Sequence, residues 1–159
     1  MEIRSRDIET RADCERLVRA FYARAFEDDV IGWLFTDVAR LDLEAHVPRI
    51  SAFWETVLLG AASYGGGAFA PHAALHARVP LRAGHFERWL WLWATTVDEL
   101  FAGASAELAK RHAERVARAF VARLSALSSA PDRAIATRER PGAVTAALTV
   151  THHLPAPAR

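Results

Sequence analysis

Two histidines, His72 and His76, are the first residues whose spacing suggests chemistry. They are four positions apart, so on a helix both imidazoles lie on one face and can reach one atom. The helical zinc-protease motif has a glutamate directly after the first histidine, and here that position is Ala73. The pair is therefore either a ligand set for another bound group or two partly buried histidines that bond to the backbone.

The sequence around these histidines is apolar. No Asp, Glu, Lys or Arg occurs from Thr56 to Ala77, a stretch as long as a membrane span. Three glycines at 65–67 and Pro71 do not suit a helix in lipid, so we expect no membrane association. Apolar side chains flank the two imidazoles: Phe69, Leu75 and Val79. An imidazole among apolar walls is what a haem pocket requires.

Three hydrogen-bonding side chains lie on the apolar sides of other predicted helices: Tyr22, His46 and Trp89. Each also has a purely structural interpretation, as a core tyrosine, an exposed helix histidine and a core tryptophan. No order of Ser, His and Asp, no paired carboxylates and no phosphate-binding loop competes with them, since the glycines at 65–67 lack a following Lys-Ser/Thr. A two-histidine metal enzyme is a weak third possibility, because no carboxylate shares that face.

Apolar residues at spacings of three and four predict the helices that must position these side chains. They cover residues 12–27, 41–59, 69–77, 86–101 and 105–127, with a short apolar turn at 31–35. Pro48 is expected to kink the second helix, because it removes a backbone donor. No hairpin is evident, so the sequence predicts an all-α domain.

The segment from Trp89 to Trp93 is ambiguous, because tryptophan at every second position is also typical of a strand. Phe86, Trp89, Trp93 and Val97 form a helical face, and we therefore predict a helix with Trp91 off its main stripe.

Composition limits the protein class. The chain has 159 residues, 52% of them hydrophobic and 25% charged, which fits one globular core. A net charge of +1 gives no global field for a nucleic acid, so no nucleic-acid partner is expected. The single Cys14 excludes an internal disulfide and a covalent c-type haem attachment, and it favours a reducing, cytoplasmic compartment.

The periodicity stops after Leu127. Residues 128–159 contain scattered prolines in an Ala/Thr-rich sequence, and we predict a poorly ordered tail after a domain of residues 1–127. His152 and His153 in this tail are interpreted as solvated.

Several segments, in this order along the chain, resemble the group III truncated haemoglobins. They are Phe21-Tyr22, Gly32–Phe35, Ala45–Trp54, Leu58–Gly60, Tyr64–Gly66, His72–Leu75 and His85–Leu90. The resemblance covers about residues 7–127. It implies a truncated globin, a two-over-two helical sandwich around a non-covalent haem b.

The resemblance also implies roles on the distal side of the haem. Tyr22 matches the distal tyrosine, His46 the distal histidine and Trp89 the distal indole. Ile50 is the apolar neighbour on the same helix as His46, and Phe35 packs on the porphyrin. Tyr22 and Trp89 can donate hydrogen bonds to dioxygen held in the pocket.

The proximal ligand is open between two residues. Counting forward from Tyr64 along the family pattern selects His72, and counting back from Phe86 selects His76. We prefer His72, because extra residues are easier to place in the loop after the ligand helix. Ala68 stands where the family usually has proline. Two further residues are assigned to the cofactor-binding walls: Phe53 and Phe69.

The resemblance implies reversible binding of dioxygen, carbon monoxide or nitric oxide, as in an oxygen-binding or oxygen-transport globin. Peroxidase-like or nitric oxide dioxygenase-like activity, a reductase partner and a monomer or weak homo-oligomer are further expectations. The alternative is an all-α interaction or sensor module whose apolar pocket holds a partner helix or a lipid.

Overall fold

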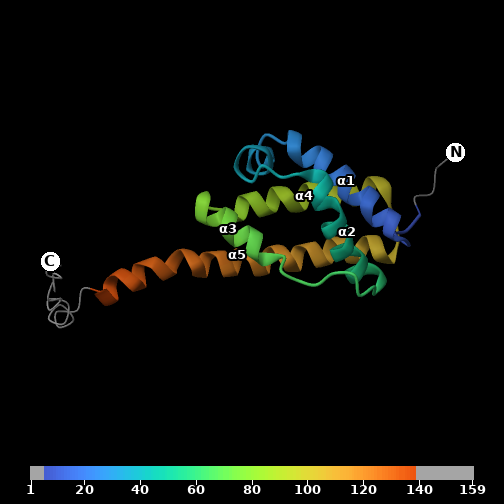
Figure 1. The fold of residues 1–159 in the computed structure, drawn as a ribbon. Helices are drawn as coiled ribbons and strands as arrows, with labels where there is room; N and C mark the ends of the chain where they lie inside the picture. The colour runs from blue at the N-terminus through green and yellow to red at the C-terminus, as the bar shows by residue number, and fades with distance from the viewer. Residues whose placement is uncertain (1–5, 139–159) are drawn as a thin grey trace, which may run out of the picture. The chain divides into compact units, whose positions relative to one another are not determined.

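The computed structural model describes residues 6–138, with side chains for residues 6–129. These residues form helices and no strand: α1 (Arg11–Glu27), η1 (Leu34–Val38), α2 (Leu43–Leu59), α3 (Phe69–Arg78), α4 (Ala83–Leu100) and α5 (Ala104–Arg138) (Figure 1). The predicted all-α class is confirmed. No helix in this part of the chain is both long and apolar enough to cross a membrane.

Helix α1 begins at a strong N-terminal cap. The Thr10 side chain accepts a hydrogen bond from the Asp13 N–H, and the Asp13 carboxylate accepts one from the Thr10 N–H, which together form a capping box. Arg6 binds the same carboxylate, which is almost fully buried. The start of the helix that carries Tyr22 is therefore fixed at Thr10.

The turn after α1 is fixed by Asp28 and Gly32. The Asp28 carboxylate accepts hydrogen bonds from the N–H groups of Val30 and Ile31 and from Arg88 of α4. A Cβ on Gly32 would lie 2.6 Å from the Phe26 carbonyl oxygen, so only glycine fits there. This turn leads into η1, which places Phe35 beside α1.

The core lies where α1, α2, α4 and α5 meet. The Trp93 ring stacks on Trp54 of α2 with ring centroids 4.5 Å apart, and its indole N–H donates to the Ala109 carbonyl of α5. Phe21 of α1 packs edge-on against Trp93 at 5.4 Å. Trp93 is 1% exposed and is therefore the residue that ties the four helices together.

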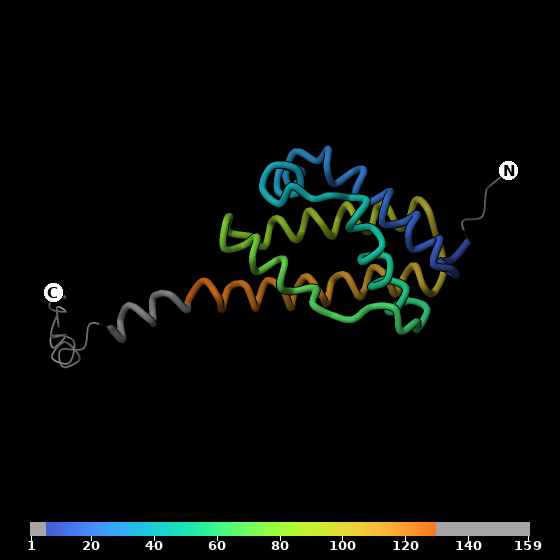
Figure 2. Tube along the Cα trace, in the orientation of Figure 1, coloured from blue at the N-terminus to red at the C-terminus, as the bar shows by residue number. Residues whose placement is uncertain are grey.

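Helix α3 is held differently from the others. Close backbone packing in the described residues joins α1 to α2, α4 and η1, and it includes neither α3 nor α5. Gly60, with a positive φ of 72°, ends α2, and Figure 2 shows the extended segment that leads from there to α3. None of the residues of α3 is fully buried, although it carries apolar side chains and both histidines. Helix α3 thus packs through partly buried side chains, and Phe69 and His72 both contact Phe120 of α5.

The observed helices differ from the predicted ones mainly at α5. It runs to Arg138, whereas the end of the periodicity predicts an end at Leu127. One proline removes only one backbone donor, and the alanines on either side favour helix, so Ser128–Pro131 does not end it. The chain divides into compact units at Leu124/Ser125, within this helix. The rest of the predicted tail, residues 139–159 with His152 and His153, lies outside the described residues.

The ambiguous tryptophan segment is helical. It lies in the middle of α4, and Trp91 is 56% exposed, as its position off the apolar stripe predicts. The predicted turn at 31–35 is partly a π-helical turn, since η1 begins at Leu34. Helix α2 continues through Pro48, whose carbonyl accepts a hydrogen bond from Arg11 of α1.

Candidate functional site

Tyr22 lies in a ring of aromatic side chains on the apolar side of α1. Its ring is 5.8 Å from Phe35 and 5.8 Å from His46, both nearly perpendicular to it, and it is 7% exposed. Burial raises the pKa of the phenol, so the hydroxyl keeps its proton. No hydrogen bond joins this hydroxyl to another described residue, and burial is the cause of the raised pKa.

His46 projects from α2 toward both α1 and α3. Its ring meets Tyr22, and it is half-buried. Burial, then Arg49 and then the nearby imidazole of His72 lower the pKa of His46. His46 is therefore neutral near pH 7, and its imidazole is close enough to that of His72 for their charges to interact.

His72 is anchored by one of its ring nitrogens. Nδ1 donates to the Ala68 carbonyl oxygen, 2.8 Å away, and the ring packs against Phe120 of α5 at 4.8 Å. Burial lowers the pKa of His72 and outweighs the hydrogen bond, which acts in the opposite direction. In the neutral imidazole the proton is on Nδ1, so Nε2 carries a lone pair.

His76 has the opposite arrangement. Its Nδ1 accepts a hydrogen bond of 2.9 Å from the N–H of Leu81. A neutral imidazole that accepts at Nδ1 carries its proton on Nε2. The two histidines of α3 therefore differ chemically, because only His72 offers Nε2 as a ligand atom while its Nδ1 bond is intact.

The remaining predicted site residues lie around these groups at different depths. Trp89 packs on Phe21 at 5.7 Å and stacks parallel to Trp93 at 5.9 Å. Ile50 and Phe35 are partly buried and pack against the core cluster. The structure thus brings Phe35 together with Tyr22 and His46. It places Trp89 beside the core ring of Phe21.

Phe53 and Phe69 lie on the side nearer α5. The Phe53 ring is 5.3 Å from Tyr64 and 5.7 Å from His112. Phe69 lies 5.3 Å from Phe120 and beneath the Arg123 guanidinium, whose carbon is 3.6 Å from the ring centroid. Neither ring contacts the cluster around Tyr22 directly.

Sequence reasoning did not identify the groups that set the tautomers of the two histidines. They are the Ala68 carbonyl, one helical turn before His72, and the Leu81 N–H after α3. The four-residue spacing to Ala68 is a signal in the sequence, but the bond from Leu81 depends on how the chain turns after Val79. The contact of Phe120 with His72 could not be predicted from the apolar period of the last helix.

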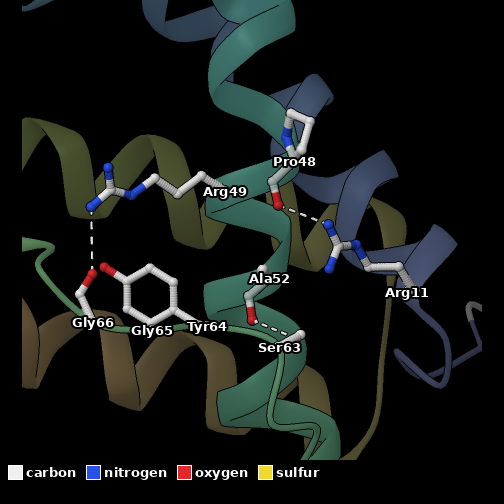
Figure 3. Close-up of a pocket in the computed structure, with 8 residues that line it drawn as sticks. All are labelled: Arg11, Pro48, Arg49, Ala52, Ser63, Tyr64, Gly65 and Gly66. Atoms are coloured by element: carbon white, nitrogen blue, oxygen red, sulfur yellow. Dashed lines mark hydrogen bonds between the residues drawn. The ribbon is translucent and has the colours of Figure 1, made fainter.

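An open hollow lies on another side of α2. It has a volume of about 550 Å³ and is lined by Arg11, Pro48, Arg49, Ala52, Ser63, Tyr64, Gly65 and Gly66 (Figure 3). Arg49 reaches across it toward the Gly66 carbonyl at 3.4 Å. None of the predicted site residues lines it, so this hollow is separate from the cluster of Tyr22, His46 and His72.

No group of three or more His, Cys, Asp or Glu side chains in the described residues is arranged to hold a metal ion. The candidate site is thus a single anchored imidazole facing half-buried apolar and hydrogen-bonding side chains.

Comparisons with known proteins agree with this architecture. No protein-family model and no curated protein matches the chain. The fold is similar to the crystal structure of a group III truncated haemoglobin from Campylobacter jejuni, with a TM-score of 0.64 and 24% sequence identity. The match covers 74% of this chain and 94% of that one. The resemblance seen in the sequence is confirmed at the level of architecture: the chain has the truncated-globin fold.

Proposed function

We propose that the protein binds haem b without a covalent bond, with His72 as the proximal ligand, and that it binds a diatomic gas reversibly. The observation that carries this proposal is the anchored imidazole of His72, because its Nδ1–H is held by the Ala68 carbonyl and its Nε2 is left to bind iron. His76, the alternative ligand, accepts a hydrogen bond at Nδ1 and is the poorer candidate.

The surrounding residues fit a flat, largely apolar group. On α3 the larger apolar and the imidazole side chains are half-buried, and several of the residues between them are exposed: the half-buried ones include Phe69, His72, Leu75 and His76. Across from it, α2 presents His46 and a set of partly buried apolar side chains: Ile50, Phe53, Val57 and Leu58. A ligand inserted between α2 and α3 would complete the burial of both faces.

A bound haem would supply an iron atom that takes up dioxygen, carbon monoxide or nitric oxide. Around it, the Ala68 carbonyl holds the Nδ1 proton of His72 and raises the basicity of the imidazole. The Tyr22 hydroxyl, kept protonated by burial, would donate a hydrogen bond to a polar gas ligand, and the Trp89 indole N–H is a second candidate donor. The apolar side chains exclude water. Redox activity toward nitric oxide or peroxide stays a prediction from the resemblance.

Haem titration tests the proposal directly. The purified protein should take up one haem per chain and show a Soret band that shifts when carbon monoxide is added. His72→Ala should lose the five-coordinate ferrous spectrum, whereas His76→Ala should keep it. No stoichiometric haem uptake by the folded protein would refute the proposal, and loss of the spectrum in His76→Ala alone would refute the assignment of His72.

A further inference from the structure

Three arginines without a carboxylate partner lie together on one side of α5. Arg111, Arg115 and Arg118, here called the arginine row, are exposed and lie on successive turns of one side of the helix. Within the described residues, no ion pair joins them to an acid, although Glu114 lies between them in sequence. Six other cations do pair with carboxylates: Arg6, Arg11, Arg19, Arg24, Arg88 and Lys110.

The arginine row is also concave. The three side chains line a hollow of about 340 Å³ together with Leu108 and Glu114. The whole chain has a net charge of only +1, so the positive potential of this surface is local. A local patch of unpaired cations attracts and orients a partner of opposite charge.

The arginine row lies on α5, the helix that also contacts residues of the proposed haem site. Arg115 contacts the Nδ1 of His112 at 3.3 Å, and the His112 ring is 5.7 Å from Phe53 and 5.9 Å from Trp54. Two turns further along α5, Phe120 packs on His72. Because a helix with its side chains is about 10–12 Å wide, a partner on the arginine row is roughly one helix diameter from the residues that face the pocket.

Aromatic rings fill the space between the arginine row and the distal side. From His112 they continue through Trp54 to Trp93, with centroids 4.5 Å apart, and on to Trp89, 5.9 Å further. Trp89 is one of the proposed distal donors. Aromatic rings in near contact thus connect His112, which Arg115 contacts, with Trp89.

We propose that the arginine row is the docking surface for an acidic electron-donor protein that reduces the haem iron. This inference rests on the proposed haem function. One electron leaves the donor, which is oxidised by one electron, and the ferric iron gains it and becomes ferrous; no covalent bond forms or breaks. A nucleic acid is a poorer fit, because three charges in one hollow do not follow an extended phosphate backbone.

Binding to an acidic flavodoxin, used as the probe donor, tests the docking surface. Calorimetric titration of the haem-loaded and the haem-free protein should give binding that weakens as salt is added. The triple variant R111E/R115E/R118E should weaken it by about tenfold or more and flatten its salt dependence, and R111Q/R115Q/R118Q should have a smaller effect of the same sign. The control Arg40→Glu changes an exposed arginine outside α5 and should leave the affinity unchanged. Unchanged helicity by circular dichroism shows that the variants fold.

Each other result has a distinct meaning. Haem uptake with flavodoxin affinity equal in wild type and triple variant would overturn the docking surface and leave the proposed function intact. Absence of haem uptake would instead refute the proposed function. Arginine-row-dependent binding to phosphatidylglycerol vesicles or duplex DNA, with none to flavodoxin, would assign the surface to a membrane or a nucleic acid and overturn the inference.

Discussion

At Tyr22, a side chain that is 7% exposed carries its hydroxyl beside the rings of Phe35 and His46. The hydroxyl is protonated, surrounded by aromatic rings and without a hydrogen-bond partner among the described residues. Among the described residues, the buried side-chain oxygen without a hydrogen-bond partner is that of Ser51, so the Tyr22 oxygen is not closed off from solvent. A ligand can therefore bond to this hydroxyl without displacing an internal hydrogen bond.

Tyr22→Phe should therefore separate ligand binding from folding. Removing the hydroxyl deletes one donor to bound dioxygen, so the dioxygen dissociation rate should rise about tenfold, equivalent to roughly 1.4 kcal/mol. Stopped-flow displacement of dioxygen by carbon monoxide measures this rate. The free energy of unfolding of the haem-free protein should stay the same or rise, because no internal hydrogen bond is lost.

The other tyrosine provides a matched control. Tyr64 packs on Phe53 and lines the hollow beside α2, away from the Tyr22 cluster. Tyr64→Phe should leave dioxygen release unchanged. Equal release rates in Tyr22→Phe and wild type would remove Tyr22 from the distal site.

Individual site residues were predictable to different degrees. Tyr22, His46 and Phe35 lie on apolar faces with the periods that the sequence shows, and the structure brings their rings together. The preference between His72 and His76 could only be argued from the resemblance, because both share one face. What distinguishes them is a backbone carbonyl and a backbone N–H, and the side-chain pattern carries no information on where those groups point.

At the scale of elements, several hydrogen bonds to one carboxylate hold the N-terminal cap of α1. Asp13 is 2% exposed, and its carboxylate accepts hydrogen bonds from Arg6, from the N–H groups of Glu9 and Thr10, and from the Thr10 hydroxyl. Burial alone would raise the pKa of Asp13, but these bonds outweigh it and lower the pKa to about 2.

Asp13→Asn should destabilise the protein by about 1–2 kcal/mol at pH 7, since the charge that holds Arg6 is lost while part of the cap remains. The stabilisation by Asp13 is complete above the pKa of the unfolded chain, near 3.8, and is lost as the pH falls toward 2. Urea unfolding at pH 7 and pH 2.5 should therefore show a large difference in the free energy of unfolding between wild type and variant at the higher pH only.

Glu15→Gln is the control. It breaks an exposed pair with Arg11 and should cost less than about 0.5 kcal/mol. Equal losses in the two variants at pH 7 would contradict this account of the cap.

The helices themselves were largely predictable, because their apolar stripes repeat with the helical period. The ends of α1, α2 and α3 fall within a residue or two of the predicted ones, where capping residues or glycines mark them. The predicted end of α5 was wrong, because the loss of an apolar stripe was interpreted as loss of helix. A solvent-facing helix needs propensity but no stripe, so periodicity cannot detect its continuation.

At the scale of the whole molecule, the core and the candidate pocket both favour neutral histidines. His46, His72 and His112 lie on three helices, and burial is the first cause of the lowered pKa of each. Arg49 and His72 further lower the pKa of His46, and Arg115 that of His112. The folded state therefore favours the neutral form of all three imidazoles, and the proposed ligand His72 must be neutral to bind a metal.

Stability of the haem-free protein should therefore fall as the pH drops below about 6.5, the pKa of histidine in an unfolded chain. Below that pH the unfolded chain takes up protons that the folded one resists, so the free energy of unfolding decreases by up to about 1.4 kcal/mol per pH unit for each histidine. The fall continues until the pH reaches the lowered pKa values of the folded state.

His112→Gln, outside the proposed ligand set, should make this pH dependence of the free energy of unfolding shallower, as measured by urea unfolding between pH 7.5 and pH 5. Haem should oppose the fall, because a bound cofactor stabilises only the folded chain. A free energy of unfolding that is constant from pH 7.5 to pH 5 in the haem-free protein would show that these imidazoles are not held neutral by the fold.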